Sequence, residues 1–162
     1  MKDNLLIVAC SAERSVDEEH TELIPAIEFY DGGVIRPLRE RLYSASTSRV
    51  HLSSLLSNVY FLSAKYGLVH ATENVLWYEQ PLDEQRATEL RPEVMHQLEQ
   101  LVFQNLYEEI FFVIEPFYMQ LFTSDLSNLP GSPRLGFLFD HANGWAQLNR
   151  VLSEWGWWTN GV

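Results

Sequence analysis

The segment 59–69 constrains this chain most, because a strand-forming apolar run there leads directly into a polar corner. Residues 59–62 can build a buried strand, and a hydroxyl, an ammonium, a phenol and a glycine follow within five positions. The N-terminus repeats the pattern, since the apolar run 5–9 ends at Cys10 and Ser11. In open α/β sheets, ligands sit beyond the carboxyl ends of parallel strands. The two corners are therefore predicted to border one shared site.

Four apolar runs are spaced along the chain as the strands of an alternating α/β fold would be. They cover residues 4–9, 59–62, 109–114 and 134–139, and helical patterns separate them. This order predicts a three-layer α/β/α sandwich with a mostly parallel sheet of about four strands and right-handed crossovers. A chain of 162 residues is about one domain, so we expect residues 1–162 to form a single α/β domain.

Helical periodicity predicts the segments between these strands. Residues 18–45 form two helices or one sharply bent helix in this prediction, because Asp31, Gly32 and Gly33 break the pattern. Pro92 indicates that a helix begins near it. The other predicted helices cover residues 81–104, 117–126 and 145–155, and the serine-rich segment 44–57 could carry a short helix.

The net charge of −11, from 22 acidic and 11 basic residues, limits the partners that the chain can have. A protein that grips duplex DNA normally presents a basic face, and only Arg36, Arg39 and Arg41 cluster here. Duplex DNA is therefore disfavoured as a partner. A small anionic or nucleotide-like ligand in a locally basic pocket stays compatible with the acidic surface.

Cysteine and histidine usage predicts neither a metal site nor another cofactor. One cysteine excludes an intramolecular disulfide and a multi-cysteine zinc site, and the five histidines show no paired i, i+4 spacing. Apolar stretches end well before the roughly 20 residues of a membrane span, and the N-terminus lacks a signal pattern. We therefore expect a cytoplasmic protein that is not inserted in a membrane.

The first corner offers a thiol and a hydroxyl. If a helix opened after Cys10, nearby backbone N–H groups would favour its thiolate and make it a nucleophile. The alternative is a small, half-buried thiol that packs at the end of the strand. Ser11 is expected either to bind a phosphate or ribose or to cap a helix.

The second corner offers a cation beside a glycine. Lys65 could meet an anionic ligand at the strand terminus, although most lysines are solvated surface residues. Ser63 and Tyr66 are expected to donate hydrogen bonds to the ligand, unless Tyr66 is only a wall residue. Gly67 permits a positive φ or a close approach of the backbone.

Aromatic and acidic residues farther along the chain complete the predicted site. In residues 77–82, Trp77 and Tyr78 form a platform on which a base or sugar could stack, and Glu79 adds a carboxylate. The alternative is that these aromatics cap the core. Glu115 and Asp140 each end a predicted strand, and His141 follows Asp140. We expect Glu79 and Asp140 to be the acid–base groups, with Glu115 and His141 as further candidates.

Several motifs resemble a microbial and phage family of uncharacterised domains. That family has Cys-Ser-x-x-Lys after the first strand, Leu-Tyr-x-Gly at a helix and Leu-Ser-Ala-Lys-Tyr-Gly-Leu after the second strand. Residues 62–68 match the last motif, 27–32 are similar to the second, and 77–82 are similar to a later Pro-Tyr-Asp-x-x-Leu. A more distant similarity to the YaaA peroxide-stress proteins implies a nucleic-acid-related role.

The chain departs from this family pattern where the motif has its lysine. Counted from Cys10 and Ser11, the lysine position falls on Arg14, and Glu13 precedes it. Either Arg14 takes over the role of the lysine, or this chain has lost or changed an anionic ligand.

Two functions from different classes fit these residues. The first is a small protein that handles a nucleotide or nucleobase-sugar and acts on a glycosidic bond, with Ser63, Lys65 and Tyr78 holding the ligand. The second is a non-catalytic binding or accessory module that recognises a modified nucleotide or a protein. In that case the C-terminal cluster of Trp155, Trp157 and Trp158 would contact the partner or a second copy of the chain.

Overall fold

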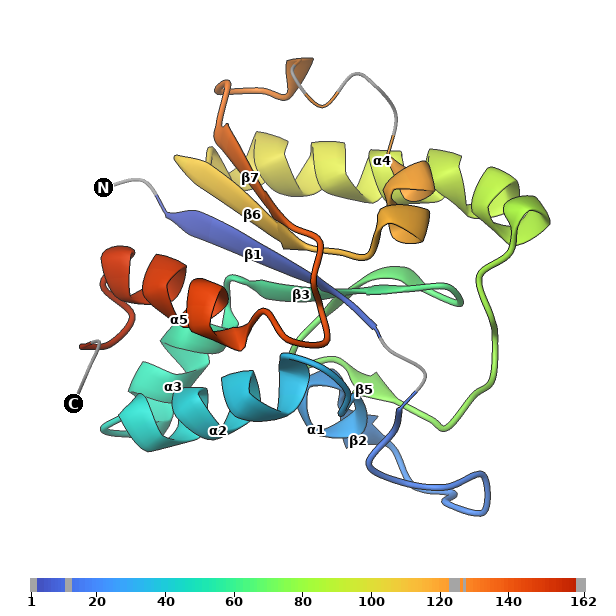
Figure 1. The fold of residues 1–162 in the computed structure, drawn as a ribbon, viewed down its shortest axis with the longest axis horizontal. Coiled ribbons are helices and arrows are strands. Elements are labelled where there is room, and N and C mark those ends of the chain that lie inside the picture. The colour runs from blue at the N-terminus through green and yellow to red at the C-terminus, as the bar shows by residue number, and fades with distance from the viewer. Residues whose placement is uncertain (1–2, 11–12, 123–125, 127, 160–162) are drawn as a thin grey trace.

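The chain folds around a five-stranded, mostly parallel sheet with helices packed against it (Figure 1). The computed structural model describes residues 3–10, 13–122, 126 and 128–159. In the order β4-β3-β1-β6-β7, only β4 runs antiparallel to its neighbour. The strands are β1 (Asn4–Ala9), β3 (Val59–Ser63), β4 (Gly67–His70), β6 (Glu109–Val113) and β7 (Arg134–Leu138). The mixed α/β class and the four parallel strands expected from the sequence are confirmed.

The fifth strand, β4, was not expected. Gly67 has a φ of +74°, which lets the chain turn back after β3 so that Ser63 pairs with Gly67. The sequence 63–67 therefore forms a hairpin corner rather than the start of a crossover. A separate two-stranded sheet joins β2 (Ile24–Pro25) to β5 (Asn74–Val75).

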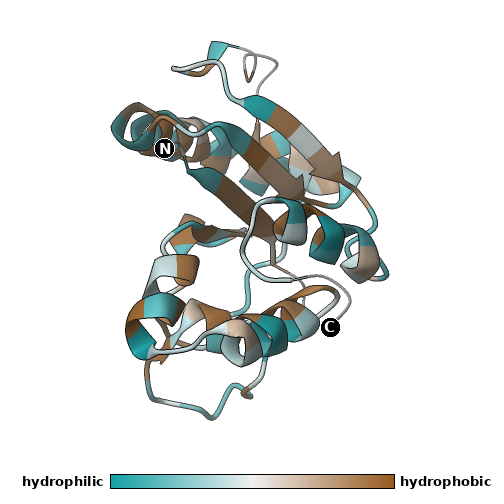
Figure 2. Ribbon diagram, turned by 90° about the vertical axis from the view of Figure 1, so that its left-hand side faces the viewer, coloured by the Kyte–Doolittle hydropathy of each residue, from teal (hydrophilic) through white to brown (hydrophobic). Residues whose placement is uncertain are grey.

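Side chains alternate between the two faces of β1, and each face has its own apolar cluster. Leu5 and Ile7 belong to the cluster beneath α4 (Glu84–Asn105), whereas Leu6 and Val8 belong to the cluster beneath α2 (Ile35–Ala45). Figure 2 shows the apolar strands between helices of mixed hydropathy. The α4 face also carries the 3₁₀ helix η1 (Pro116–Leu121), and the α2 face carries α1 (Ala26–Phe29), α3 (Arg49–Leu56) and α5 (Trp145–Glu154).

Two helix predictions need correction. Residues 18–45 do contain two helices, but these start only at Ala26 and Ile35. Pro92 does not mark a helix start, because α4 begins at Glu84, where the Asp83 side chain caps it by accepting from the Arg86 amide at 2.7 Å. This cap and a buried stripe of apolar residues keep Pro92 inside the helix.

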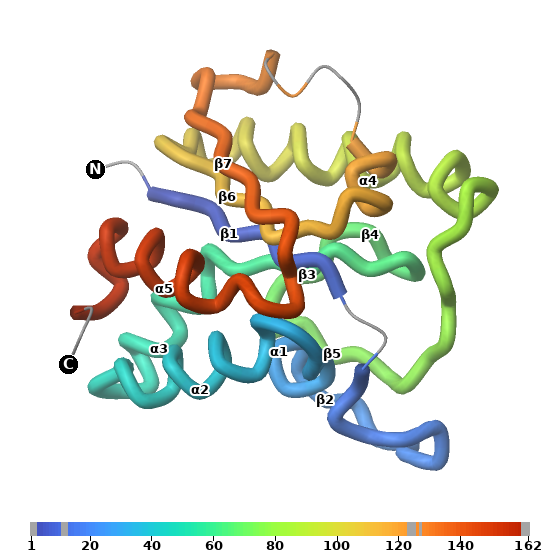
Figure 3. The backbone as a smooth tube through the Cα atoms, in the orientation of Figure 1, coloured from blue at the N-terminus to red at the C-terminus, as the bar shows by residue number. Residues whose placement is uncertain are grey.

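An extended segment, residues 76–83, links the two layers of helices. Figure 3 shows it leaving β5 and running past the carboxyl edge of the sheet to α4. Trp77 and Tyr78 pack against the cluster on the α2 face, whereas Leu82 packs against the cluster on the α4 face. This segment, called the strap below, forms one wall of the candidate site. Among the described helices, none is both long enough and apolar enough to cross a membrane.

Candidate functional site

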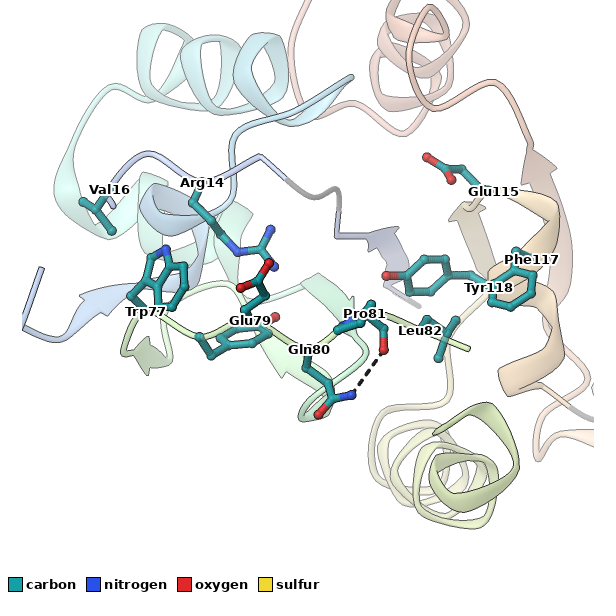
Figure 4. A pocket seen from close by; sticks show the side chains of 11 residues that line it. Arg14, Val16, Trp77, Glu79, Gln80, Pro81, Leu82, Glu115, Phe117 and Tyr118 are labelled. Carbon is teal, nitrogen blue, oxygen red and sulfur yellow. Dashed lines mark hydrogen bonds between the residues drawn. The ribbon is translucent and has the colours of Figure 1, made fainter. Parts of the chain in front are cut away.

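A cavity of about 640 Å³ opens at the carboxyl ends of the parallel strands. Figure 4 shows Trp77, Arg14 and Glu79 at one end of it, and Glu115, Phe117 and Tyr118 across from them. The volume falls in the range of pockets that hold drug-sized ligands. Its described lining consists of Arg14, Val16, Trp77, Tyr78, Glu79, Gln80, Pro81, Leu82, Glu115, Phe117 and Tyr118.

Arg14 is held at the cavity by backbone pairing and by aromatic rings. Its backbone forms an antiparallel bridge with Tyr30. Its guanidinium carbon lies 5.0 Å from the ring centroid of Tyr78, 5.2 Å from that of Tyr30 and 5.4 Å from that of Phe29. Cation–π attraction to three rings restricts where this charge can lie. The site therefore contains a positive charge with a defined position and a planar fork of donors.

The opposite wall comes from the segment that follows β6. Glu115 directly precedes η1, and its carboxylate is exposed. Tyr118, one turn later, points its hydroxyl toward the middle of the cavity (Figure 4). Burial raises the pKa of the Tyr118 hydroxyl, so it acts as a neutral hydrogen-bonding group. Glu79 and Glu115 thus border one cavity from two segments.

Beneath the cavity, three buried hydroxyls form a hydrogen-bonded chain. The Tyr78 hydroxyl lies 2.7 Å from that of Tyr30 and 2.6 Å from that of Ser63. Ser63 Oγ also accepts hydrogen bonds from the backbone amides of Lys65 and Tyr66, at 3.1 and 3.3 Å. Burial is the main cause that raises the pKa of Tyr78, to about 12. This chain fixes the Tyr78 ring as the cavity wall.

Cys10 lies at the inner end of this cluster and is not an activated nucleophile. The residue is only 5% exposed, and burial raises the pKa of its thiol to about 12. A hydrogen bond from Tyr30 and the charge of Arg14 both lower this pKa, but burial outweighs them. The structure therefore favours the packed, protonated thiol of the two sequence interpretations. Ser11, its predicted companion, lies outside the described residues.

The second corner is shaped by α4 rather than by a ligand. Arg86 donates hydrogen bonds to the backbone carbonyls of Ala64 and Lys65, each at 2.7 Å. Gln97 accepts from the Leu68 amide at 2.8 Å, and a Cβ on Gly67 would lie 2.4 Å from the Gln97 side-chain oxygen. The glycine is thus required both by its positive φ and by this close approach.

Lys65 and Tyr66 lie at the edge of this arrangement. Lys65 is exposed, and its ammonium nitrogen lies 5.3 Å from the ring centroids of Tyr66 and Tyr78. Arg14 and Lys65 therefore share the Tyr78 ring, although Lys65 is not among the described residues that line the cavity. Tyr66 packs edge-on against Tyr78 at 5.3 Å and is a wall residue behind it.

Asp140 and His141, at the end of β7, have structural partners. The Asp140 carboxylate accepts from the Asn143 amide at 3.0 Å, and it is not among the described lining residues of the cavity. His141 is buried, and its Nε2 donates to the Ala9 carbonyl at 2.7 Å. Its ring lies against Gly33, where a Cβ would come within 2.1 Å of Nδ1. His141 therefore fastens the end of β1 to the loop before α2.

The predicted basic and tryptophan clusters are also occupied within the chain. Arg36 and Arg39 both pair with Asp31, and these hydrogen bonds hold the pKa of the Asp31 carboxyl below its usual range. Arg41 lies over the Trp158 ring, and Trp158 is buried. Trp155 and Trp157 pack against the same core cluster. Each of these described residues therefore contacts other parts of the chain, although Trp155 and Trp157 are only half-buried.

The sequence reasoning missed Tyr30, Phe117 and Tyr118 as site residues. The sequence pattern assigns Tyr30 to the helical segment 18–45 by its spacing, and Tyr118 to the predicted helix 117–126. The signal that could have found Tyr118 is its position three residues after Glu115, at the carboxyl end of a predicted parallel strand.

Comparisons with protein-family models, with curated proteins and with solved structures give no significant match to this chain. Among the described residues, no three His, Cys, Asp or Glu side chains form a group that could hold a metal ion. The site is therefore interpreted from its own residues.

Proposed function

We propose that this protein binds a nucleoside or a nucleoside monophosphate in the cavity between Arg14, Trp77 and Glu115, on a three-layer α/β/α sandwich. The observation that carries the proposal is the lining of one cavity with aromatic rings at both ends and with charges of both signs. A base needs a flat aromatic face, and a sugar needs acceptors for its hydroxyls. Trp77 and Tyr118 provide the first, and Glu79 and Glu115 provide the second.

The charge of the lining favours ligands with few phosphates. Arg14 is the one positive residue in the described lining, against Glu79 and Glu115. A triphosphate would bring several negative charges next to two carboxylates, which disfavours its binding. One phosphate can be held by the guanidinium fork of Arg14, with Lys65 nearby over the same tyrosine ring. We therefore expect nucleosides and monophosphates to bind better than triphosphates.

The position of Arg14 supports the family resemblance in one respect. Arg14, at the place of the family lysine, lines the cavity, whereas Glu13 before it is exposed. This favours Arg14 as a replacement for the lysine over the loss of an anionic ligand. The resemblance to the uncharacterised microbial and phage domains stays a proposal on these motifs.

Cleavage of the glycosidic bond of the bound nucleoside is the second candidate function. Glu79 and Glu115 border the same cavity, and enzymes that cleave glycosidic bonds commonly use two carboxyl groups. A carboxyl group that donates a proton near neutral pH usually lies in an apolar, closed environment. Because Glu79 and Glu115 are exposed, the geometry supports binding without turnover better than catalysis.

A thermal-shift series tests the binding proposal. Each nucleoside should raise the unfolding temperature at millimolar concentration, the monophosphate about equally, and the triphosphate least. No stabilisation by any of them would refute the proposal. Chromatography of the same mixtures for released base then separates the two candidates. Release by the native chain that is lost in both Glu79→Gln and Glu115→Gln would establish cleavage.

A further inference from the structure

A second, smaller cavity lies at the opposite edge of the sheet, where β1 begins. Its volume is about 210 Å³, and its described lining comes from the start of β1, the end of α3 and the turn after α5. Figure 1 shows these three segments on the side of the molecule where the N-terminus is marked. The lining residues are Asp3, Asn4, Ser54, Leu55, Asn58, Trp155, Gly156 and Trp157.

Two indole rings form one side of this cavity at an angle to each other. The ring centroids of Trp155 and Trp157 are 5.5 Å apart, and their planes are inclined by 59°. Trp155 is also held edge-on by Phe111 at 6.5 Å, and Trp157 by Trp158 at 6.2 Å. The face of a tryptophan ring attracts a cation more strongly than the face of any other side-chain ring.

The turn that carries these rings is fixed by the end of α5. The Trp157 amide donates to the Leu152 carbonyl at 3.1 Å, and the Gly156 amide donates to the Ser153 carbonyl at 2.9 Å. With Gly156 at a φ of +85°, this is a Schellman motif, which ends the helix and places a tryptophan on each side of the glycine. The cavity therefore lies at a helix C-terminus, whose partial negative charge favours a cation.

The polar groups at the cavity also favour a positive ligand that carries N–H donors. Asp3 is the only charged residue in the described lining, and it is negative. A protonated amine can donate N–H hydrogen bonds to this carboxylate as well as pair with its charge.

We propose that this cavity is a binding site for a primary alkylammonium group. The ammonium would donate to the Asp3 carboxylate, pair with its charge, and lie against the rings of Trp155 and Trp157. A volume of about 210 Å³ has room for a short alkylamine. The site lies at the amino ends of the strands, and none of its described lining residues also lines the cavity of Arg14 and Glu115. It is therefore independent of the proposed nucleoside binding.

Titration of the full ¹⁵N-labelled chain with n-butylammonium, followed by NMR, tests this site. We expect saturable shifts of the Trp155 and Trp157 indole signals and of the Asn4 side-chain amide, and none of the Trp77 indole. n-Butanol, the neutral analogue, should not produce them. Tetramethylammonium, which has no N–H donor, should bind more weakly than n-butylammonium. Equal binding of n-butanol, or no saturable shift with n-butylammonium, would overturn the proposal.

Variants test whether n-butylammonium binds at this cavity. Trp157→Ala should weaken n-butylammonium binding by roughly 3- to 30-fold, and Trp157→Phe should retain most of it because a ring remains. Asp3→Asn should weaken binding, and Asn4→Asp should strengthen it at low salt. Trp77→Ala is the matched control and should leave the affinity unchanged. If Trp157→Ala does not fold, unchanged affinity in both Asp3→Asn and Asn4→Asp would still contradict the site.

Discussion

Two groups of functional residues lie at the carboxyl edge of the sheet. One group, the sealed half, is buried and hydrogen-bonded within the chain, and the other, the open half, lines a cavity. In the sealed half, the hydroxyls of Ser63 and Tyr30 both form hydrogen bonds with the Tyr78 hydroxyl, and Cys10 is buried beside them. In the open half, Arg14 and Glu79 face a cavity of about 640 Å³. Groups that are hydrogen-bonded within the chain thus hold the fold, and groups that border the cavity are left to meet a ligand.

The largest expected effect is a difference in stability between a variant in the sealed half and a variant in the open half. Ser63→Ala removes the acceptor of two backbone amides and the partner of the Tyr78 hydroxyl, all in a buried place. We expect it to lower the free energy of unfolding by about 2–4 kcal/mol. Glu79→Gln, on the open half, should change it by less than about 0.5 kcal/mol. Urea denaturation of both variants measures the contrast, and equal stabilities would abolish the distinction.

High pH should lower the stability of the folded chain through Cys10, which belongs to the sealed half. The pKa of Cys10 is raised from 9.0 to about 12, so above pH 9 the unfolded chain loses this proton while the folded chain keeps it. Stability is therefore unaffected by this group below pH 9 and falls as the pH rises toward 12. The loss should reach about 2 kcal/mol at pH 10.5. Cys10→Ala should unfold with a flatter pH profile, and a profile parallel to that of the native chain would contradict the assignment.

Substitutions in the open half should change the affinity of the chain for a nucleoside. Trp77→Ala removes a stacking surface, so we expect roughly tenfold weaker binding of a nucleoside, or about 1.4 kcal/mol. Isothermal titration calorimetry measures the change, and Trp157→Ala is the matched control because it removes a tryptophan from the opposite edge of the sheet. Equal losses in the two variants would mean that the cavity of Trp77 is not the binding site.

The smallest effect is expected at the border between the halves. Lys65 is exposed and contacts the Tyr78 ring only from outside the cavity. Lys65→Ala should change the affinity for an uncharged nucleoside by less than about twofold and the stability by less than about 0.5 kcal/mol. Its effect should be larger for a monophosphate. A tenfold loss for the uncharged nucleoside would place Lys65 in the binding machinery after all.

The parallel strands could be predicted from the sequence, because buried apolar runs of strand length are a local signal. The β4 hairpin could not, since it depends on Gly67 meeting Gln97 from a distant helix. The same limit applies to the site. Glu79 and Tyr78 carry a local signal of aromatic and acidic residues, but Tyr118 joins them only because the strap from β5 to α4 runs past the carboxyl edge of the sheet.

Asp140 illustrates why a carboxylate at the end of a strand is not sufficient for function. Its position after β7 matched the expected place of a site residue, yet its carboxylate accepts from the Asn143 amide in the following turn. Whether such a group meets a ligand depends on the local hydrogen bonds that compete for it. Glu115, at the end of β6, is exposed and borders the cavity instead.

NMR titration of the ¹⁵N-labelled chain with a nucleoside is the most direct test of the central claim, that the open half of the carboxyl edge is a ligand site. We predict saturable shifts at the Trp77 indole and at the backbone amides of Glu79 and Tyr118, with the Trp157 indole unmoved. Shifts confined to the Trp157 side of the sheet, or none at millimolar nucleoside, would contradict it.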